Sequence, residues 1–90
     1  RTPHALAWFT LSVRVGLGHD AETLIGGTLD KFASDRRVMS MATARQGMSI
    51  DITYETRLRK DSIPDDLVKA LNRIEGIQSV ELQRRAEIEA

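Results

Sequence analysis

The sequence predicts a single α+β domain in which a sheet carries two helices on one face. Segments with alternating apolar and polar residues, the pattern of half-buried strands, occur near both ends and in the middle of the chain. Two segments with helical spacing of apolar residues separate them, so the predicted order is β-α-β-β-α-β. The chain has 90 residues, enough for one domain, and 41% of them are hydrophobic, enough for one core.

The first predicted strand covers residues 7–15. Its inward positions alternate along the segment and are Phe9, Leu11, Val13 and Val15. Trp8 and Arg14 fall on the opposite face. Residues 16–19 follow as a loop rich in glycine. Asp20 is expected to cap the next helix, because its carboxylate can accept free backbone N–H groups of the first turn.

The first predicted helix extends to about residue 33. Its apolar stripe consists of Leu24, Ile25, Leu29 and Phe32. Gly26 and Gly27 lie inside it, each at a cost of up to about 1 kcal/mol relative to Ala. Close approach of another backbone or a local break in the helix would explain the pair. Residues 34–37 are expected to turn the chain into a second strand over residues 38–45, whose alternation is weaker.

A turn at Gln46-Gly47 joins this strand to a third, over residues 50–59, and makes the pair a hairpin. The inward positions of the third strand are Ile50, Ile52, Tyr54, Thr56 and Leu58. Ser62 is predicted to cap the second helix, with Pro64 in its first turn. The buried stripe of that helix is Leu67, Ala70, Leu71 and Ile74. Gly76 is predicted to end the helix in a left-handed conformation.

The last predicted strand covers residues 77–84, with Val80 and Leu82 inward. Four antiparallel strands and two helices in this order give a ferredoxin-like sandwich, with both helices on one sheet face and the other face free for solvent or a partner. The predicted core comprises Phe9, Leu11, Val13, Val15, Leu24, Ile25, Leu29, Phe32, Ile50, Ile52, Tyr54, Leu58, Leu67, Leu71, Ile74, Val80 and Leu82.

The chain ends are expected to lie outside this domain. Residues 1–6 are predicted to be a disordered segment or linker, residues 7–84 the domain, and residues 85–90 a frayed tail. The first residue is Arg1 rather than Met, so we expect a piece of a longer protein. The longest uncharged stretch, residues 5–13, is too short for a bilayer span, which takes about 20 residues.

Composition and spacing argue against several functions. Thirteen Lys and Arg balance thirteen Asp and Glu, which disfavours nucleic-acid binding. The chain has no cysteine, and His4, His19 and Asp20 are too few for a transition-metal site. Gly16 and Gly18 lack the further residues of a dinucleotide-binding loop. A Ser or Thr nucleophile would have only His19 as a base. We therefore expect no catalysis, no cofactor and no metal.

A resemblance to a known family comes from the second half of the chain. The predicted helix and last strand end in the pattern Ile-x-Gly-Ile-x-x-Val-x-Leu, from Ile74 to Leu82. With the preceding strand, this pattern resembles the closing half of an ACT domain, a small regulatory module. Residues 7–84 also resemble the soluble C-terminal domain of an uncharacterised bacterial membrane-protein family, in which a few transmembrane helices precede an ACT-like domain. MgtC-type membrane proteins end in a similar domain.

This resemblance implies a regulatory or assembly role at the cytoplasmic face of the bacterial inner membrane. A homodimer of this domain would couple two membrane-embedded parts of the same chain. ACT-like domains commonly pair edge to edge or face to face, and Trp8, Met39 and Met41 are predicted to form an apolar patch beside the first two strands. The predicted interface residues are Trp8, Arg14, Met39, Met41 and Arg57.

The alternative function is sensing of a small molecule, either an amino acid or a nucleotide. Ligand-binding ACT domains of amino-acid metabolism usually place Asp-x-Pro-Gly between the first strand and the first helix. Here the segment from Val15 to Asp20 has no proline, and its aspartate follows the glycines. Under this alternative the expected ligand-binding residues are Gly16, Gly18, His19 and Asp20.

Overall fold

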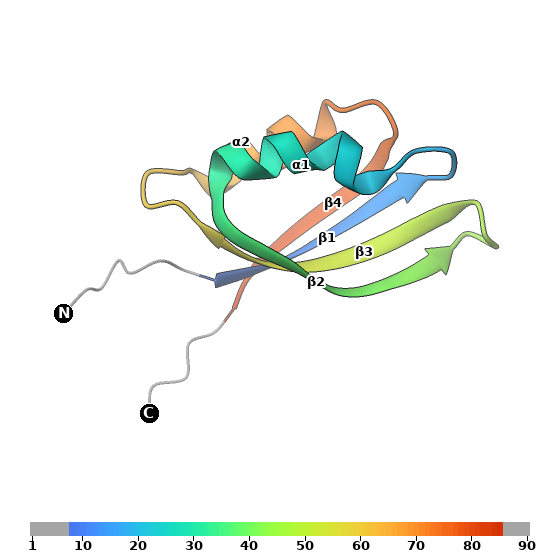
Figure 1. Cartoon of the computed structure of the whole chain (residues 1–90), viewed down its shortest axis with the longest axis horizontal. Coiled ribbons are helices and arrows are strands. Elements are labelled where there is room, and N and C mark those ends of the chain that lie inside the picture. Colours follow the sequence, from blue (N-terminus) through green and yellow to red (C-terminus); the bar gives the residue numbers. More distant parts are fainter. Residues whose placement is uncertain (1–7, 86–90) are drawn as a thin grey trace.

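A computed structural model describes residues 8–85 as one sheet with two helices. Its elements are β1 (Trp8–Gly16), α1 (Ala21–Phe32), β2 (Ala33–Ala44), β3 (Ser49–Leu58), α2 (Pro64–Asn72) and β4 (Ile77–Arg84). Both helices lie on the same side of the sheet (Figure 1). The predictions for residues 1–6 and for the tail after Arg85 concern chain outside the described residues.

The strand order across the sheet is β2-β3-β1-β4, and all three neighbouring pairs are antiparallel. β1 and β3 are therefore central, while β2 and β4 are the edges. This arrangement confirms the predicted α+β, ferredoxin-like sandwich with two helices on one face of a four-stranded antiparallel sheet. Arg85 extends the sheet by one contact, because its backbone N–H donates to the Trp8 carbonyl at 3.0 Å.

The core lies between the sheet and the helices. All the predicted core side chains are buried or packed against the buried cluster. Leu11 sits at the centre, paired with Tyr54 on β3 and with Leu82 on β4. Three further side chains, which the predicted core did not include, belong to this cluster or pack against it: Ala21, Ala33 and Ile77.

The junction between α1 and β2 differs from the prediction. No turn occupies residues 34–37, because α1 ends at Phe32 and β2 begins at Ala33. Two donors secure the junction: the Arg59 backbone N–H and the Ser62 hydroxyl both bond the Phe32 carbonyl, at 2.8 and 2.9 Å. The polar residues that looked like a turn belong to an edge strand, where polar side chains reach solvent.

The helix ends also differ in detail. Asp20 is the N-cap residue of α1, but its carboxylate accepts a hydrogen bond from the Thr23 hydroxyl at 2.5 Å and not from the backbone. The N-cap of α2 is Ile63, since the hydroxyl of Ser62 is engaged at the α1–β2 junction. Gly76 does have a positive φ of 103°, but it follows the end of α2 instead of capping it.

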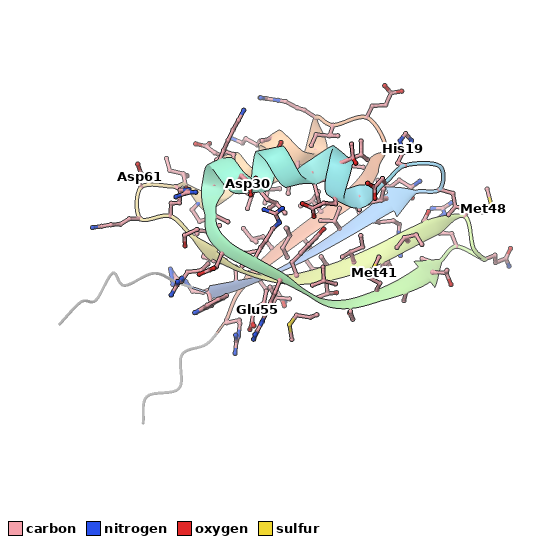
Figure 2. The ribbon with its side chains drawn as sticks, viewed as in Figure 1. His19, Asp30, Met41, Met48, Glu55 and Asp61 are labelled. Carbon is pink, nitrogen blue, oxygen red and sulfur yellow. The ribbon has the colours of Figure 1, made fainter. Side chains whose placement is uncertain are left out.

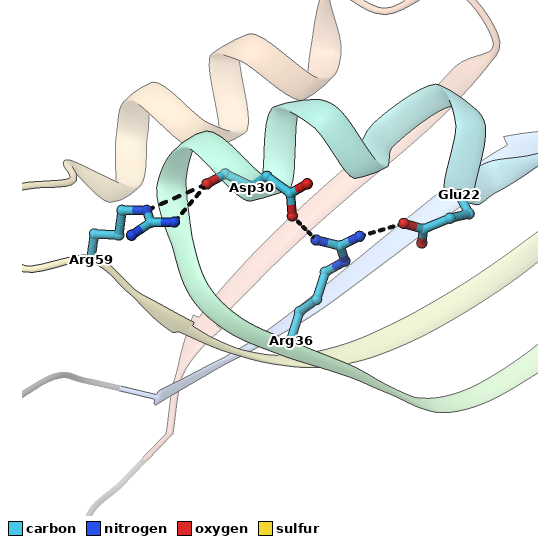
Figure 3. Close-up of polar contacts among 4 residues, drawn as sticks. All are labelled: Glu22, Asp30, Arg36 and Arg59. Carbon is cyan, nitrogen blue, oxygen red and sulfur yellow. Dashed lines mark hydrogen bonds and ion pairs between the residues drawn. The ribbon is translucent and has the colours of Figure 1, made fainter.

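The two glycines of α1 have separate explanations. A Cβ on Gly26 would lie 2.5 Å from a carboxylate oxygen of Glu22 and 3.3 Å from Nη2 of Arg36, whereas a Cβ on Gly27 would meet open space. Gly26 thus leaves room for the pairing of Glu22 with Arg36 (Figure 3). The helix is continuous, which excludes a local break, and the atoms nearest to Gly26 belong to side chains, which excludes close approach of another backbone.

Candidate functional site

The loop between β1 and α1 is tied to the rest of the domain by two backbone hydrogen bonds. The Gly16 N–H donates to the Gly76 carbonyl at 3.0 Å, and the Leu17 N–H donates to the Met48 carbonyl at 3.2 Å. The imidazole of His19 packs over Gly76, where a Cβ would lie 3.1 Å from the ring. This loop places His19 at the end of the molecule that also carries Met48 (Figure 2).

An apolar groove of about 370 Å³ begins at this loop and lies between the start of α1 and the middle of β2. Its lining comprises Val15, His19, Asp20, Ala21, Glu22, Val38, Met41, Ile50, Ile52 and Tyr54. Of the four predicted ligand-binding residues, the structure brings His19 and Asp20 to the groove. Gly16, at the end of β1, and Gly18, in the loop, are not part of its lining.

The groove exists because the helix side of β2 remains exposed beyond its first residues. Val38 pairs with Tyr54 and Met41 pairs with Ile52, so all four side chains face the helices. Tyr54 and Ile52 are buried, but Val38 and Met41 on the edge strand are more than half exposed. The helices therefore leave this part of the edge strand β2 uncovered (Figure 1).

The polar rim of the groove is acidic. Arg36 reaches from β2 to α1 and pairs with both Glu22 and Asp30, while Arg59 donates two hydrogen bonds to the Asp30 carbonyl at 3.0 and 3.3 Å (Figure 3). Because two carboxylates already engage Arg36, this guanidinium is not free for an anionic ligand. Asp20 and Glu22 are the carboxylates that line the groove, and Glu22 is the one already paired with Arg36.

Tyr54 forms part of the groove floor and gives a direct test of its polarity. Burial, and then the negative charge of Glu22, raise the pKa of the Tyr54 phenol. Its contribution to stability is fully present below the unfolded-state pKa of about 10 and is lost as the pH rises through the higher folded-state pKa. Tyr54 is the only tyrosine, so its phenolate absorbance reports this group alone.

We expect the Tyr54 phenol to ionise at higher pH in the native protein than in the same chain in denaturant. We also expect Tyr54→Phe to reduce the loss of folding stability at alkaline pH. A native titration at or below the denatured one would contradict this account of the groove.

The sheet face away from the helices carries paired charges. Arg14 donates two hydrogen bonds to the carboxylate of Asp51, at 2.7 and 3.0 Å, and this contact lowers the pKa of Asp51. Glu55 is buried on the same face and pairs with Arg37 at 2.8 Å and with Arg85. Figure 2 shows Glu55 on the side of the sheet opposite α1. Such compensation leaves little uncompensated positive charge for a phosphate backbone.

The predicted interface residues occupy two separate surfaces. Trp8 pairs with Arg57, whose guanidinium lies 5.2 Å from the indole centre and also bonds Asp35 at 2.6 Å. These residues share the open face with Arg14. Met41 lies on the helix side, and Met39 is the extra residue of a bulge between Val38 and Ser40. The predicted patch of Trp8, Met39 and Met41 is therefore not a single surface, because β3 separates their strands.

Sequence reasoning missed the groove because the bulge hides its pattern. Val38 and Met41 are three residues apart, which breaks strict alternation, yet the inserted Met39 returns both to the same face. The weak alternation of residues 38–45 was the feature of the sequence that could have indicated this bulge. Glu22 gave no such signal, since an acidic residue in a first helical turn is usually explained by the helix dipole.

The described residues contain neither a metal-binding cluster nor a helix suited to a bilayer. Residues 8–85 contain no group of three or more His, Asp or Glu placed to hold a metal ion. Within the same residues, neither helix combines the length and the apolar character needed to cross a bilayer.

The sheet order and the helix placement define an ACT-like, ferredoxin-like domain. Among solved structures, the chain is similar to the ACT domain from GTP pyrophosphokinase of Chlorobium tepidum, with a TM-score of 0.58 and 14% sequence identity. The match covers 87% of this chain and 99% of that one. No family model matches the sequence, and no curated protein matches it. The likeness establishes the fold, and the predicted ties to membrane-protein families stay predictions.

Proposed function

We propose that this chain is a non-catalytic regulatory or assembly domain that acts by pairing with a second copy of itself through β2. The observation that carries the proposal is the free edge of this strand. β2 is 12 residues long and has a neighbour, β3, on one side only among the described residues. After the bulge at Met39, residues 40–44 continue in regular register with β3 and contain no charge and no proline.

An edge of this kind favours pairing with another strand. Natural edge strands are usually blunted by charge, proline, bulges or short length. In β2 the bulge and the charged residues Asp35, Arg36 and Arg37 occupy the first part, which leaves the second part open. An antiparallel second copy presents the same stretch, so the contact closes as a twofold dimer. Overlap of residues 40–44 places Ala42 near the twofold axis and leaves the charged part outside it.

A single cysteine tests this geometry, because the native chain has none. We expect Ala42→Cys to give a disulfide-linked dimer under mild oxidation, since only residues near the axis come close enough to their counterparts. The matched control is Ser79→Cys, at an exposed position on the other edge strand, β4, which should pair as before but form no disulfide-linked dimer. Cross-linking through Ser79→Cys alone, or a native protein that sediments as a monomer at high concentration, would overturn the proposal.

The proposal includes a location at the cytoplasmic face of a bacterial inner membrane, as the C-terminal part of a membrane protein. The ends of the described fold support a tether of this kind, because the Arg85 N–H bonds the Trp8 carbonyl and so places the first and last described residues, Trp8 and Arg85, side by side. Figure 1 shows these ends opposite the β2–β3 turn, so a tether would not cover residues 40–44. Sequencing the gene upstream of Arg1 tests the location: several apolar spans of about 20 residues are expected, and a soluble enzyme domain there would contradict it.

The second candidate function is small-molecule sensing, favoured by the groove between α1 and β2. Its apolar floor and acidic rim suit a ligand with an apolar body and an ammonium group. An apolar amino acid meets this description if its carboxylate stays in solvent, whereas the phosphates of a nucleotide would face the carboxylates of the rim. A thermal-shift screen of both classes tests this candidate. Stabilisation by an apolar amino acid that is weakened by Glu22→Gln supports sensing, and a silent screen counts against it.

A further inference from the structure

All three methionines of the chain are exposed and lie along the β2–β3 hairpin. Their exposed fractions are 54% for Met39, 62% for Met41 and 63% for Met48. Methionine more often fills gaps in apolar cores or contact surfaces. Because the sequence has no cysteine, these thioethers are the sulfur groups that an oxidant can reach.

The three side chains have different relations to the proposed contact. Met41 is within residues 40–44 and faces the helix side opposite Ile52. Met39 is the bulge residue just before that stretch, and Met48 belongs to the turn that precedes β3. Figure 2 shows Met41 on β2 and Met48 at the far end of the hairpin. A change of polarity at Met41 would therefore act on pairing, and the same change at Met48 would not.

We propose that Met41 is a peroxide-sensitive modification site whose oxidation separates paired copies of the domain. The inference rests on the proposed pairing through β2. The thioether sulfur attacks one oxygen of hydrogen peroxide, an S–O bond forms, the O–O bond breaks, and the second oxygen leaves as water after proton transfer. Sulfur loses two electrons and peroxide gains them, so no further reactant is needed.

The sulfoxide opposes pairing because it is polar. With Ala42 on the twofold axis, Met41 of each copy would lie opposite Thr43 of the other copy, on the helix side of the sheet and beside Val38. The sulfoxide oxygen is a strong acceptor, Val38 and Ile52 offer it no donor, and the Thr43 hydroxyl is the donor that this side of the joined edges supplies. Exchange of the full hydration of this oxygen for that single contact is unfavourable, so the oxidised edge stays exposed.

The experiment compares association before and after peroxide treatment of the whole chain. Mass spectrometry verifies the addition of one oxygen atom to each exposed methionine, and sedimentation equilibrium gives the dimer Kd. We expect oxidation to raise Kd about tenfold or more, the size of effect that follows when a buried acceptor loses most of its hydrogen bonds to water. Methionine sulfoxide reductases should restore the original value.

Two leucine variants assign the effect. Met41→Leu should pair normally and keep its Kd after peroxide treatment, since leucine has a similar volume and no sulfur. Met48→Leu should still lose pairing on oxidation. An unchanged Kd in fully oxidised native protein, or equal sensitivity in the Met41→Leu variant, overturns the inference and leaves the proposed pairing intact. A native protein that is monomeric before oxidation overturns both.

Discussion

Leu11→Ala is expected to lower the free energy of unfolding by about 3–4 kcal/mol, as for other fully buried leucines. Leu11 has no exposed surface and lies in the central strand β1, between Tyr54 and Leu82 on its two neighbours. β1 is hydrogen-bonded to β3 on one side and to β4 on the other, so the backbone around the cavity cannot move in easily to fill it. A domain of this size is stabilised by about 5–10 kcal/mol in total, so the variant is expected to be partly unfolded at physiological temperature.

Leu17→Ala is the matched control for this prediction. Leu17 is the same residue type in the β1–α1 loop, but it is 52% exposed. Its truncation is expected to change the unfolding free energy by less than about 0.5 kcal/mol. Urea denaturation followed by tryptophan fluorescence measures both variants, because Trp8 is the only tryptophan. Similar losses in the two variants would contradict the placement of Leu11 at the centre of the core.

Gly76→Ala is expected to be the next most damaging change, at about 2 kcal/mol. Gly76 has a φ of 103°, and an L residue with a positive φ carries roughly 1–2 kcal/mol of strain. The added Cβ would also lie 3.1 Å from the His19 ring, which must move. This contact belongs to the turn whose carbonyl holds Gly16, so the substitution should loosen the β1–α1 loop as well.

Gly18→Ala separates the two causes. Gly18 has a similar φ of 91°, but a Cβ there would have open space around it. The backbone term alone predicts a loss of about 1 kcal/mol. Denaturation midpoints of the two variants give the comparison, and the NMR signals of His19 report whether its ring moves in Gly76→Ala. Equal losses in both variants, with the ring undisturbed, would contradict the contact between Gly76 and His19.

Burial patterns were predictable from sequence wherever periodicity was uninterrupted. Phe9 to Val15 and Ile50 to Leu58 alternate strictly, and the two strands pair in the register that puts their apolar faces together. The helical stripes of α1 and α2 were equally clear. Prediction failed at junctions, because residues 34–37 and Ser62 have the side chains of turns and caps but are held by contacts to distant segments. A local pattern contains no information about such partners.

The candidate sites were also predictable only in part, where local sequence patterns identify them. The sequence identified the loop that carries His19 and Asp20, since two glycines before a helix mark a backbone turn. It did not identify Val38, Ile52 and Tyr54 as parts of one groove with that loop. Nor did it separate Trp8 from Met41. Both results depend on strand order and on a bulge, which are properties of the assembled sheet.

The sequence by itself determined the order of elements, the core side chains and the overall fold, because apolar periodicity is local and burial of apolar surface is the main driving force for folding. Tertiary structure decided which faces and edges stay open. The order β2-β3-β1-β4 leaves β2 at the rim beyond the helices, and the bulge at Met39 turns Val38 and Met41 to the same side. Those two features create the groove and the free edge on which the proposed functions depend.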